Sequence, residues 1–138
     1  MNPDLLPAAR ILVAGGVLNL VLSFLLGWVL AAKRTKEPID KHHWLLVAHE
    51  VSLQGGLLLL GLAVALGFAK LPPEWAVRAA WLLVAASAFQ DFSGITNWLR
   101  RTGDQFAEKS LGWVFASINA VLNTAGLLIV AAGVLHAL

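Results

Sequence analysis

Apolar and polar residues are segregated along this chain into long blocks. Four apolar stretches, at residues 8–32, 44–69, 75–99 and 111–137, are separated by three polar segments. Each stretch exceeds the roughly 20 residues that a helix needs to cross the hydrocarbon core of a bilayer. No segment alternates polar and apolar residues over the length of a strand. The pattern therefore predicts one all-α domain over residues 1–138, a four-helix transmembrane bundle.

The composition agrees with lipid as the solvent. Hydrophobic residues make up 59% of the 138 residues and charged residues 13%, whereas a soluble domain carries about 25% charged residues. The chain has no cysteine, which excludes disulfides, thiolate metal sites and covalent haem attachment. The formal charge of +2 indicates no nucleic-acid partner, because the basic residues lie in short segments between apolar runs. We expect an integral membrane protein.

The distribution of basic residues predicts an orientation. Seven of the ten lie in or beside the first and third polar segments, 33–43 and 100–110: Lys33, Arg34, Lys36, Lys41, Arg100, Arg101 and Lys109. The second segment, 70–74, contains one. Because positive loops stay inside, the first and third segments are predicted to be cytoplasmic, with both termini outside. The expected location is the bacterial inner membrane.

Each predicted helix gathers its polar and small residues on one or two faces. The sets are Gly16, Asn19, Ser23 and Gly27 in the first helix; His49, Ser52 and Gly56, with Glu50, Gln54 and Gly61 beside them, in the second; Ser87, Gln90, Asp91, Gly94, Asn97 and Trp98 in the third; and Gly112, Ala116, Asn119, Asn123, Gly126 and Gly133 in the fourth. Helix packing explains the small residues. The polar ones lie about 8–15 Å from the basic ends of the helices. Polar groups inside a membrane are costly, so their shared depth predicts one cavity.

Three of these residues are candidates for chemistry. His49 is either a bonded packing residue or a ligand, since neutral imidazole is a common metal ligand and axial haem ligand. Glu50 and Asp91 are the carboxylates well inside the predicted spans. Each is either paired with Arg100 or Arg101, or acts as a proton donor or acceptor. Neither belongs to a zinc-binding HExxH motif.

Two short motifs resemble a known family. The second helix contains AHEVSLQGG at residues 48–56 and the third ends in GITNW at residues 94–98. The layout is similar to the small four-helix membrane isomerases, namely styrene oxide isomerase and the hydroxylaminobenzene mutases. In that family Ala-His opens the second helix and Asn-Gly follows about two turns later. The third helix of the family ends in Asn, often Asn-Trp.

The resemblance implies a specific site. In styrene oxide isomerase the corresponding histidine is the axial ligand of a haem b between protomers of a homotrimer, and the ferric iron acts as a Lewis acid. By the motif match His49 is that ligand, and Asn97 corresponds to the polar asparagine of the third helix. The chain departs from the family pattern in three places: Gly55 replaces the Asn of Asn-Gly, Ser93 stands where the epoxide enzyme has Asp, and Arg101 replaces a Tyr. The substrate is therefore less defined than the fold.

The predicted reaction is the rearrangement of a small aromatic or apolar substrate, from epoxide to carbonyl or from hydroxylamine to aminophenol. Asn97, Gln54, Asn119 and Asn123 are expected to orient the substrate oxygen. Asp91 or Glu50 is expected to stabilise positive charge or to move a proton. A dry site prevents water from trapping the cation-like state.

Three alternatives remain at the level of sequence. The first is a haem-free isomerase in which Glu50 and Asp91 perform acid–base chemistry. The second is a small transporter, although the first helix lacks the carboxylate that small multidrug transporters carry there. The third is a haem-carrying or structural subunit without catalytic activity.

Overall fold

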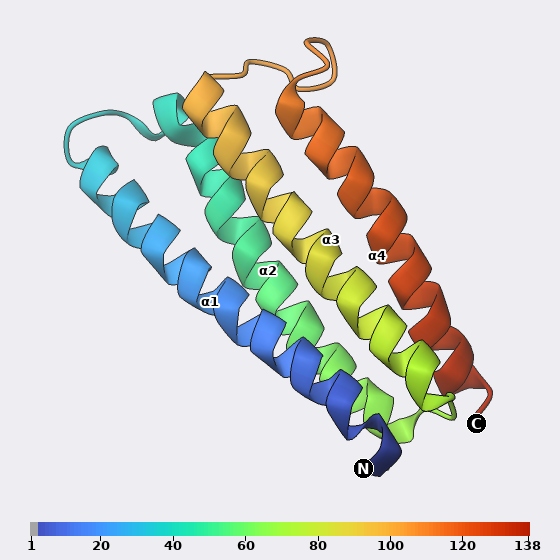
Figure 1. Cartoon of the computed structure of the whole chain (residues 1–138). Helices are drawn as coiled ribbons and strands as arrows, with labels where there is room; N and C mark the ends of the chain where they lie inside the picture. The colour runs from blue at the N-terminus through green and yellow to red at the C-terminus, as the bar shows by residue number, and fades with distance from the viewer. Residues whose placement is uncertain (1–2) are drawn as a thin grey trace.

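The computed structural model describes residues 3–138, and this part of the chain forms four long helices joined end to end (Figure 1). They are α1 (Leu6–Arg34), α2 (His43–Ala65), α3 (Pro73–Arg100) and α4 (Leu111–Leu135), with short 3₁₀ helices at Pro3–Leu5, Ile39–His42 and Leu66–Phe68. The helices alternate in direction. The α1–α2 and α3–α4 connections lie at one end of the bundle and the two termini at the other. The prediction of an all-α bundle is confirmed.

The helix ends follow local sequence signals. Proline occupies the first turn of α1 and of α3, where its missing N–H is not needed. Ser110 caps α4, since its hydroxyl accepts a hydrogen bond from the backbone N–H of Trp113. Arg101 ends α3 in the left-handed conformation, with φ 55°. The predicted boundaries agree with the observed ones to within about four residues, as expected where helix ends fray.

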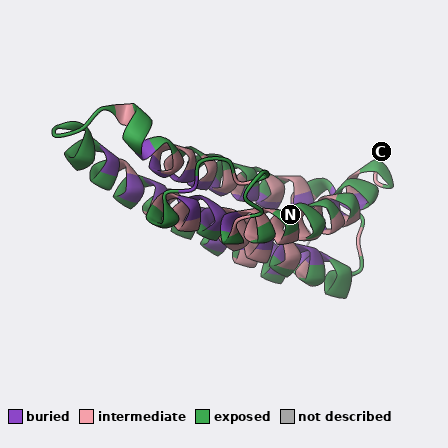
Figure 2. Cartoon of the chain, turned by 90° about the horizontal axis from the view of Figure 1, so that it is seen from above, coloured by how far each residue is buried: buried purple, intermediate pink, exposed green. Residues whose placement is uncertain are grey.

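Three helical segments are long and apolar enough to cross a membrane: Pro3–Arg34, Ile39–Phe68 and Leu111–Leu135. The sequence predicted four such spans. α3 does not qualify because polar residues interrupt its second half. Those residues pack against neighbouring helices, since Asp91, Ser93 and Asn97 are all buried. Large apolar side chains such as Phe24 and Val121 are exposed on the outside (Figure 2), as expected of a lipid-facing surface.

The central helix of the bundle is α3. It packs on α1, on α2 and most extensively on α4, while α1 and α2 form a second closely packed pair. α4 has few contacts with α2. The bundle is therefore not closed around a central axis, and α2 and α4 flank a face of α3 that they do not cover completely.

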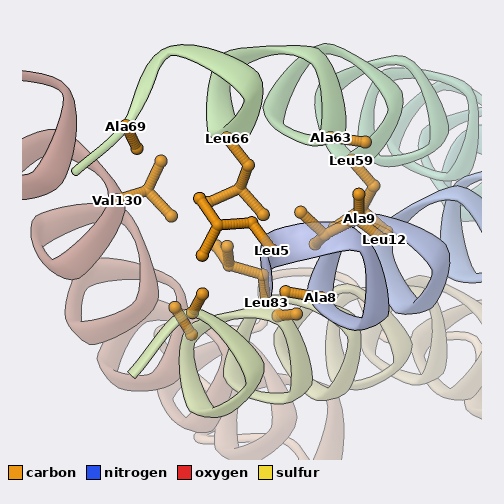
Figure 3. Packing of buried hydrophobic residues seen from close by; sticks show 13 residues of the cluster. Leu5, Ala8, Ala9, Leu12, Leu59, Ala63, Leu66, Ala69, Leu83 and Val130 are labelled. Atoms are coloured by element: carbon orange, nitrogen blue, oxygen red, sulfur yellow. The ribbon is translucent and has the colours of Figure 1, made fainter. Parts of the chain in front are cut away.

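The apolar core lies at the end of the bundle that carries the termini (Figure 3). Leu5, Leu12, Leu59, Leu66 and Leu83 are almost fully buried there. A smaller apolar cluster, built on Leu26, Leu30, Leu45 and Ala48, lies nearer the other end. The large core leaves the polar residues to the half of the bundle near the connections, as the sequence predicted.

Glycines allow the helix backbones to approach closely. A Cβ atom on Gly16 would lie 2.9 Å from the carbonyl oxygen of Gly56, and one on Gly56 would lie 2.9 Å from the carbonyl oxygen of Gly16. A Cβ on Gly94 would lie 2.9 Å from the Cα of Ala48. The backbones of α1, α2 and α3 are thus in contact. This agrees with the prediction that the small residues serve helix packing.

Candidate functional site

The polar residues in the half of the bundle near the α1–α2 and α3–α4 connections form separate groups. His49 contacts Ser23 between α1 and α2, and Asp91 contacts Ser52 between α2 and α3. Asn97 binds residues of the α3–α4 connection. They do not line the single cavity that the sequence predicted. Helical periodicity shows which residues lie on the same face of a helix, but not which neighbouring helix that face contacts.

His49 is fixed by Ser23. Its Nδ1 lies 2.8 Å from the carbonyl oxygen of Ser23 and 3.1 Å from the hydroxyl of the same residue. The Ser23 hydroxyl donates to the carbonyl oxygen of His49 at 3.0 Å. A carbonyl oxygen only accepts hydrogen bonds, so Nδ1 carries the proton and donates it. The lone pair of the imidazole is then on Nε2, which has no hydrogen-bond partner among residues 3–138.

The space beside the imidazole depends on Gly27 of α1. A Cβ atom at Gly27 would lie 3.1 Å from Cε1 and 3.3 Å from Nδ1 of His49. His49 itself is half-buried, and the following residue, Glu50, is exposed. The histidine therefore lies at the α1–α2 seam, near the outer surface of the bundle.

His49 offers one free nitrogen, Nε2, as a ligand. Residues 3–138 contain no group of three or more His, Cys, Asp or Glu that could hold an ion by themselves. A haem brings four ring nitrogens and needs an axial ligand from the protein. An imidazole whose Nδ1–H is bound to a backbone carbonyl is held in the tautomer and orientation that axial ligation requires. Of the predicted site residues, His49 is the one that fits this role.

Asp91 is a buried link between α2 and α3. The hydroxyl of Ser52 donates to its Oδ1 at 2.6 Å, and both side chains are buried. In the described part of the chain neither Arg100 nor Arg101 forms an ion pair with Asp91, so the alternative in which Asp91 pairs with an arginine is not observed. The contact positions α2 against α3, and Asp91 does not line the groove described below.

Glu50 lies on the outside of α2. It is exposed and forms no ion pair in the described structure. Counting from the first residue of α2, it is about 10 Å along the helix. A carboxylate at this level of a membrane span is costly if it faces lipid, which favours a covering partner.

Asn97 holds the α3–α4 connection. Its side chain is 0% exposed. Its Nδ2 donates to the side-chain oxygen of Gln105 at 2.8 Å, and its Oδ1 accepts from the hydroxyl of Ser110, also at 2.8 Å. Gly112 packs directly against the same side chain. Both polar atoms are used inside the chain, so the prediction that Asn97 orients a substrate oxygen is corrected to a structural role.

Replacement of Asn97 by alanine is expected to lower the free energy of unfolding by about 2–3 kcal/mol, because two buried hydrogen bonds are lost and their partners stay unpaired. Thermal unfolding in detergent measures the effect. Asn123→Ala is the matched control, since the Asn123 side chain has no partner within residues 3–138, and a change below about 1 kcal/mol is expected. Loss of turnover in a fully stable Asn97→Ala protein would contradict the structural role.

A groove of about 390 Å³ follows the exposed face of α3 between α2 and α4. Its polar lining consists of Gln54, Ser87, Gln90, Asn119 and Asn123, and its apolar lining includes Val51, Leu58, Leu59 and Leu83. The amide of Asn119 donates to the side-chain oxygen of Gln90 at 2.6 Å. Gln54 and Asn123 have no hydrogen-bond partner within the described residues. The groove, called the amide groove below, therefore offers two free amides at the depth of the membrane.

The sequence identified part of this groove. Gln54, Asn119 and Asn123 were predicted as substrate-orienting residues, and the structure brings all three together. Ser87 and Gln90 were recognised as polar positions on α3 but not as site residues. Their spacing from Asp91 and Asn97 suggested one face, whereas the structure divides that face between the amide groove and the interior.

His49 and the amide groove lie on different sides of α2. His49 contacts α1, and the groove is bounded by α3 and α4. Gln54 follows His49 by five residues, which places the two about 140° apart around the helix. One chain alone does not present both to the same substrate.

Comparison of the chain with protein-family models, with curated proteins and with solved structures gives no match in any of the three. The geometry of His49 and of the amide groove is therefore the basis for the function proposed below.

Proposed function

We propose that the chain is an intramembrane isomerase that holds haem b through His49. Its substrate is a small aromatic or apolar molecule, converted from epoxide to carbonyl or from hydroxylamine to aminophenol. The observation that supports this is the fixed imidazole of His49: its Nδ1–H donates a hydrogen bond to the carbonyl oxygen of Ser23, and Nε2 is left with a free lone pair.

Ferric haem supplies a Lewis acid that polarises a C–O or N–O bond with no net redox change. The chain supplies the surroundings. The Ser23 carbonyl holds the imidazole in one orientation and one tautomer. Gly27 lets the imidazole pack against α1, because a Cβ atom at this position would crowd Cε1 and Nδ1. Asp91 and Ser52 fix the distance between α2 and α3 and contribute positioning only.

The second half of the proposal is a homo-oligomer, with a trimer as the expected form. A cyclic, head-to-tail arrangement brings two different faces of the chain together. The His49 face of one copy would then lie against the amide groove of the next. The same contact removes Glu50 and the free amides of Gln54 and Asn123 from lipid, where unpaired polar groups are costly.

The groove residues have defined tasks in such a site. The amides of Gln54 and Asn123 orient the substrate oxygen, and Glu50, adjacent to His49, stabilises positive charge or moves a proton. An interface closed between two copies excludes water, which would otherwise add to the cation-like state. We place the α1–α2 and α3–α4 connections, with their basic residues, on the cytoplasmic side of a bacterial inner membrane.

The haem prediction is tested by absorption. Protein purified in detergent and supplied with haem is expected to show a Soret band, and His49→Ala is expected to lose it. His43→Ala is the control, since His43 is exposed at the first residue of α2. Turnover of an aryl epoxide or an arylhydroxylamine should fall at least about 100-fold in His49→Ala, because the Lewis acid contributes several kcal/mol.

Four outcomes would decide against this proposal. A Soret band that persists unchanged in His49→Ala excludes axial ligation by this residue. Full turnover in haem-free protein favours the haem-free isomerase, for which Glu50 is the exposed carboxylate nearest the histidine in sequence. A His49-dependent Soret band without turnover of either substrate favours a haem-carrying subunit, and substrate-dependent proton flux in liposomes favours a transporter.

A further inference from the structure

The two longer connections lie together at one end of the bundle (Figure 1). A second pocket is lined by residues of this end. Its volume is about 720 Å³, and it is formed where the α1–α2 connection meets the C-terminal end of α3. Lys33, Lys41 and Arg101 supply positive charge, and Trp44 and Trp98 supply aromatic walls. This basic pocket shares none of its lining with the amide groove.

A buried histidine of this pocket lacks a partner. His42 lines the pocket and is only 6% exposed. Its Nε2 lies 3.0 Å from Oε2 of Glu37, without the alignment of a hydrogen bond. Its Nδ1 is buried and has no hydrogen-bond partner among residues 3–138. A buried ring nitrogen without a partner is costly, so a polar ligand in the pocket would relieve that cost.

The N-terminus of α2 adds to the positive character of the pocket. α2 begins at His43, and no side chain caps its first turn. Uncapped N–H groups at a helix N-terminus, together with the helix dipole, favour a bound anion. The pocket also contains two carboxylates, Glu37 and Asp40, so its three cations leave an excess of positive charge.

The walls of the pocket are held in place by the chain itself. The indole N–H of Trp44 donates to the carbonyl oxygen of Thr102 at 2.6 Å, which ties the start of α2 to the segment after α3. Arg101, in the left-handed conformation, lies at that junction. Tryptophan and basic residues at a helix end are typical of the boundary between hydrocarbon and head groups.

We propose that the basic pocket binds the phosphate group of an anionic phospholipid from the leaflet on this side of the membrane. Basic pockets between membrane helices are suited to anionic head groups, and a lipid phosphodiester would accept hydrogen bonds from His42 and the lysines. Inorganic phosphate offers the same chemistry without acyl chains, so the test must separate the two sources. The proposal does not depend on the proposed isomerase activity.

The test titrates the detergent-purified full chain with phosphatidylglycerol, phosphatidylcholine or inorganic phosphate and counts bound molecules by native mass spectrometry. Phosphatidylglycerol is expected to bind the unaltered chain, and phosphatidylcholine and inorganic phosphate at least about tenfold more weakly. Lys41→Gln combined with Arg101→Gln should weaken phosphatidylglycerol binding by about 30-fold, because two cations near the head group are removed. Lys36→Gln combined with Arg100→Gln is the matched control and should change it less than about threefold.

A second variant tests the buried histidine. His42→Phe keeps an aromatic ring but removes both nitrogens, and it should weaken phosphatidylglycerol binding by about tenfold while the unfolding temperature shows that the chain is folded. Equal losses in the two charge pairs would overturn the proposal, because the effect would then be one of general surface charge. Tighter binding of inorganic phosphate than of phosphatidylglycerol would overturn the assignment to a lipid.

Discussion

An equal mixture of two inactive variants is expected to recover about a quarter of the activity of the unaltered protein. The first variant is His49→Ala, and the second is Gln54→Met combined with Asn123→Leu. If the reaction site lies between copies, it needs an intact His49 from one copy and an intact amide groove from the next. When equal amounts of the two chains assemble at random, half of the sites receive an intact His49 and half receive an intact groove. A quarter of the sites therefore receive both. Co-expression of the two chains, followed by an isomerase assay of the purified oligomers, measures the recovery.

The control for this experiment is a mixture of two variants that both damage the histidine part of the proposed site and leave the amide groove intact. His49→Ala chains co-expressed with His49→Leu chains provide no intact histidine and should show no recovery. If the first mixture also stays inactive while each variant assembles normally, histidine and groove act within one chain and the head-to-tail arrangement is wrong. The result is independent of the Soret measurement, because the second variant keeps its haem ligand.

A single added methyl group at Gly56 is expected to lower the free energy of unfolding by about 1–3 kcal/mol, because it overpacks a backbone contact. The new Cβ would lie 2.9 Å from the carbonyl oxygen of Gly16 and equally close to Leu20. α1 and α2 would have to separate to admit it. The separation would also lengthen the bonds between Ser23 and His49, so the Soret band is expected to weaken.

Gly61→Ala is the matched control in the same helix. A Cβ at Gly61 meets no atom within 4 Å, and alanine favours helix over glycine by up to about 1 kcal/mol. The two substitutions should therefore have opposite signs in titrations with a denaturing detergent. Equal effects from Gly56→Ala and Gly61→Ala would show that the close approach of α1 and α2 does not limit stability.

Much of the fold could be predicted from the sequence. Apolar stretches of membrane-spanning length leave few alternatives to helices, and the short turn at residues 70–74 forces α2 and α3 to be antiparallel neighbours. The hydropathy pattern did not reveal that α4 would rest mainly on α3. α4 packs on α3 at small residues such as Gly126, which faces Leu83 and Ala79 of α3. Small residues allow close packing against any helix, so the sequence does not show which helix is the neighbour.

The candidate site was less accessible to sequence reasoning. Depth along a helix is linear in residue number, so the sequence allows the levels of His49, Asp91 and Gln54 along their helices to be compared. The contacts of each polar side chain depend on which helix lies opposite it, and the sequence does not show this. Asn97 shows a second difficulty, because its partners Gln105 and Ser110 fold back from a connection whose path no periodicity describes. Haem binding and isomerase activity stay predictions until the spectrum and the assay are measured.

The one-sided attachment of α4, which packs on α3 and hardly on α2, has a mechanical consequence. Because α4 has few contacts with α2, a tilt of α4 over α3 would change the width of the amide groove. The same tilt leaves the contacts between Ser23 and His49 unaltered, since these belong to the α1–α2 pair. In the proposed isomerase, entry of small molecules from the bilayer would depend on the α3–α4 pair, and retention of the haem on the α1–α2 pair. Substitutions on the α3-facing side of α4 can alter one without disturbing the other.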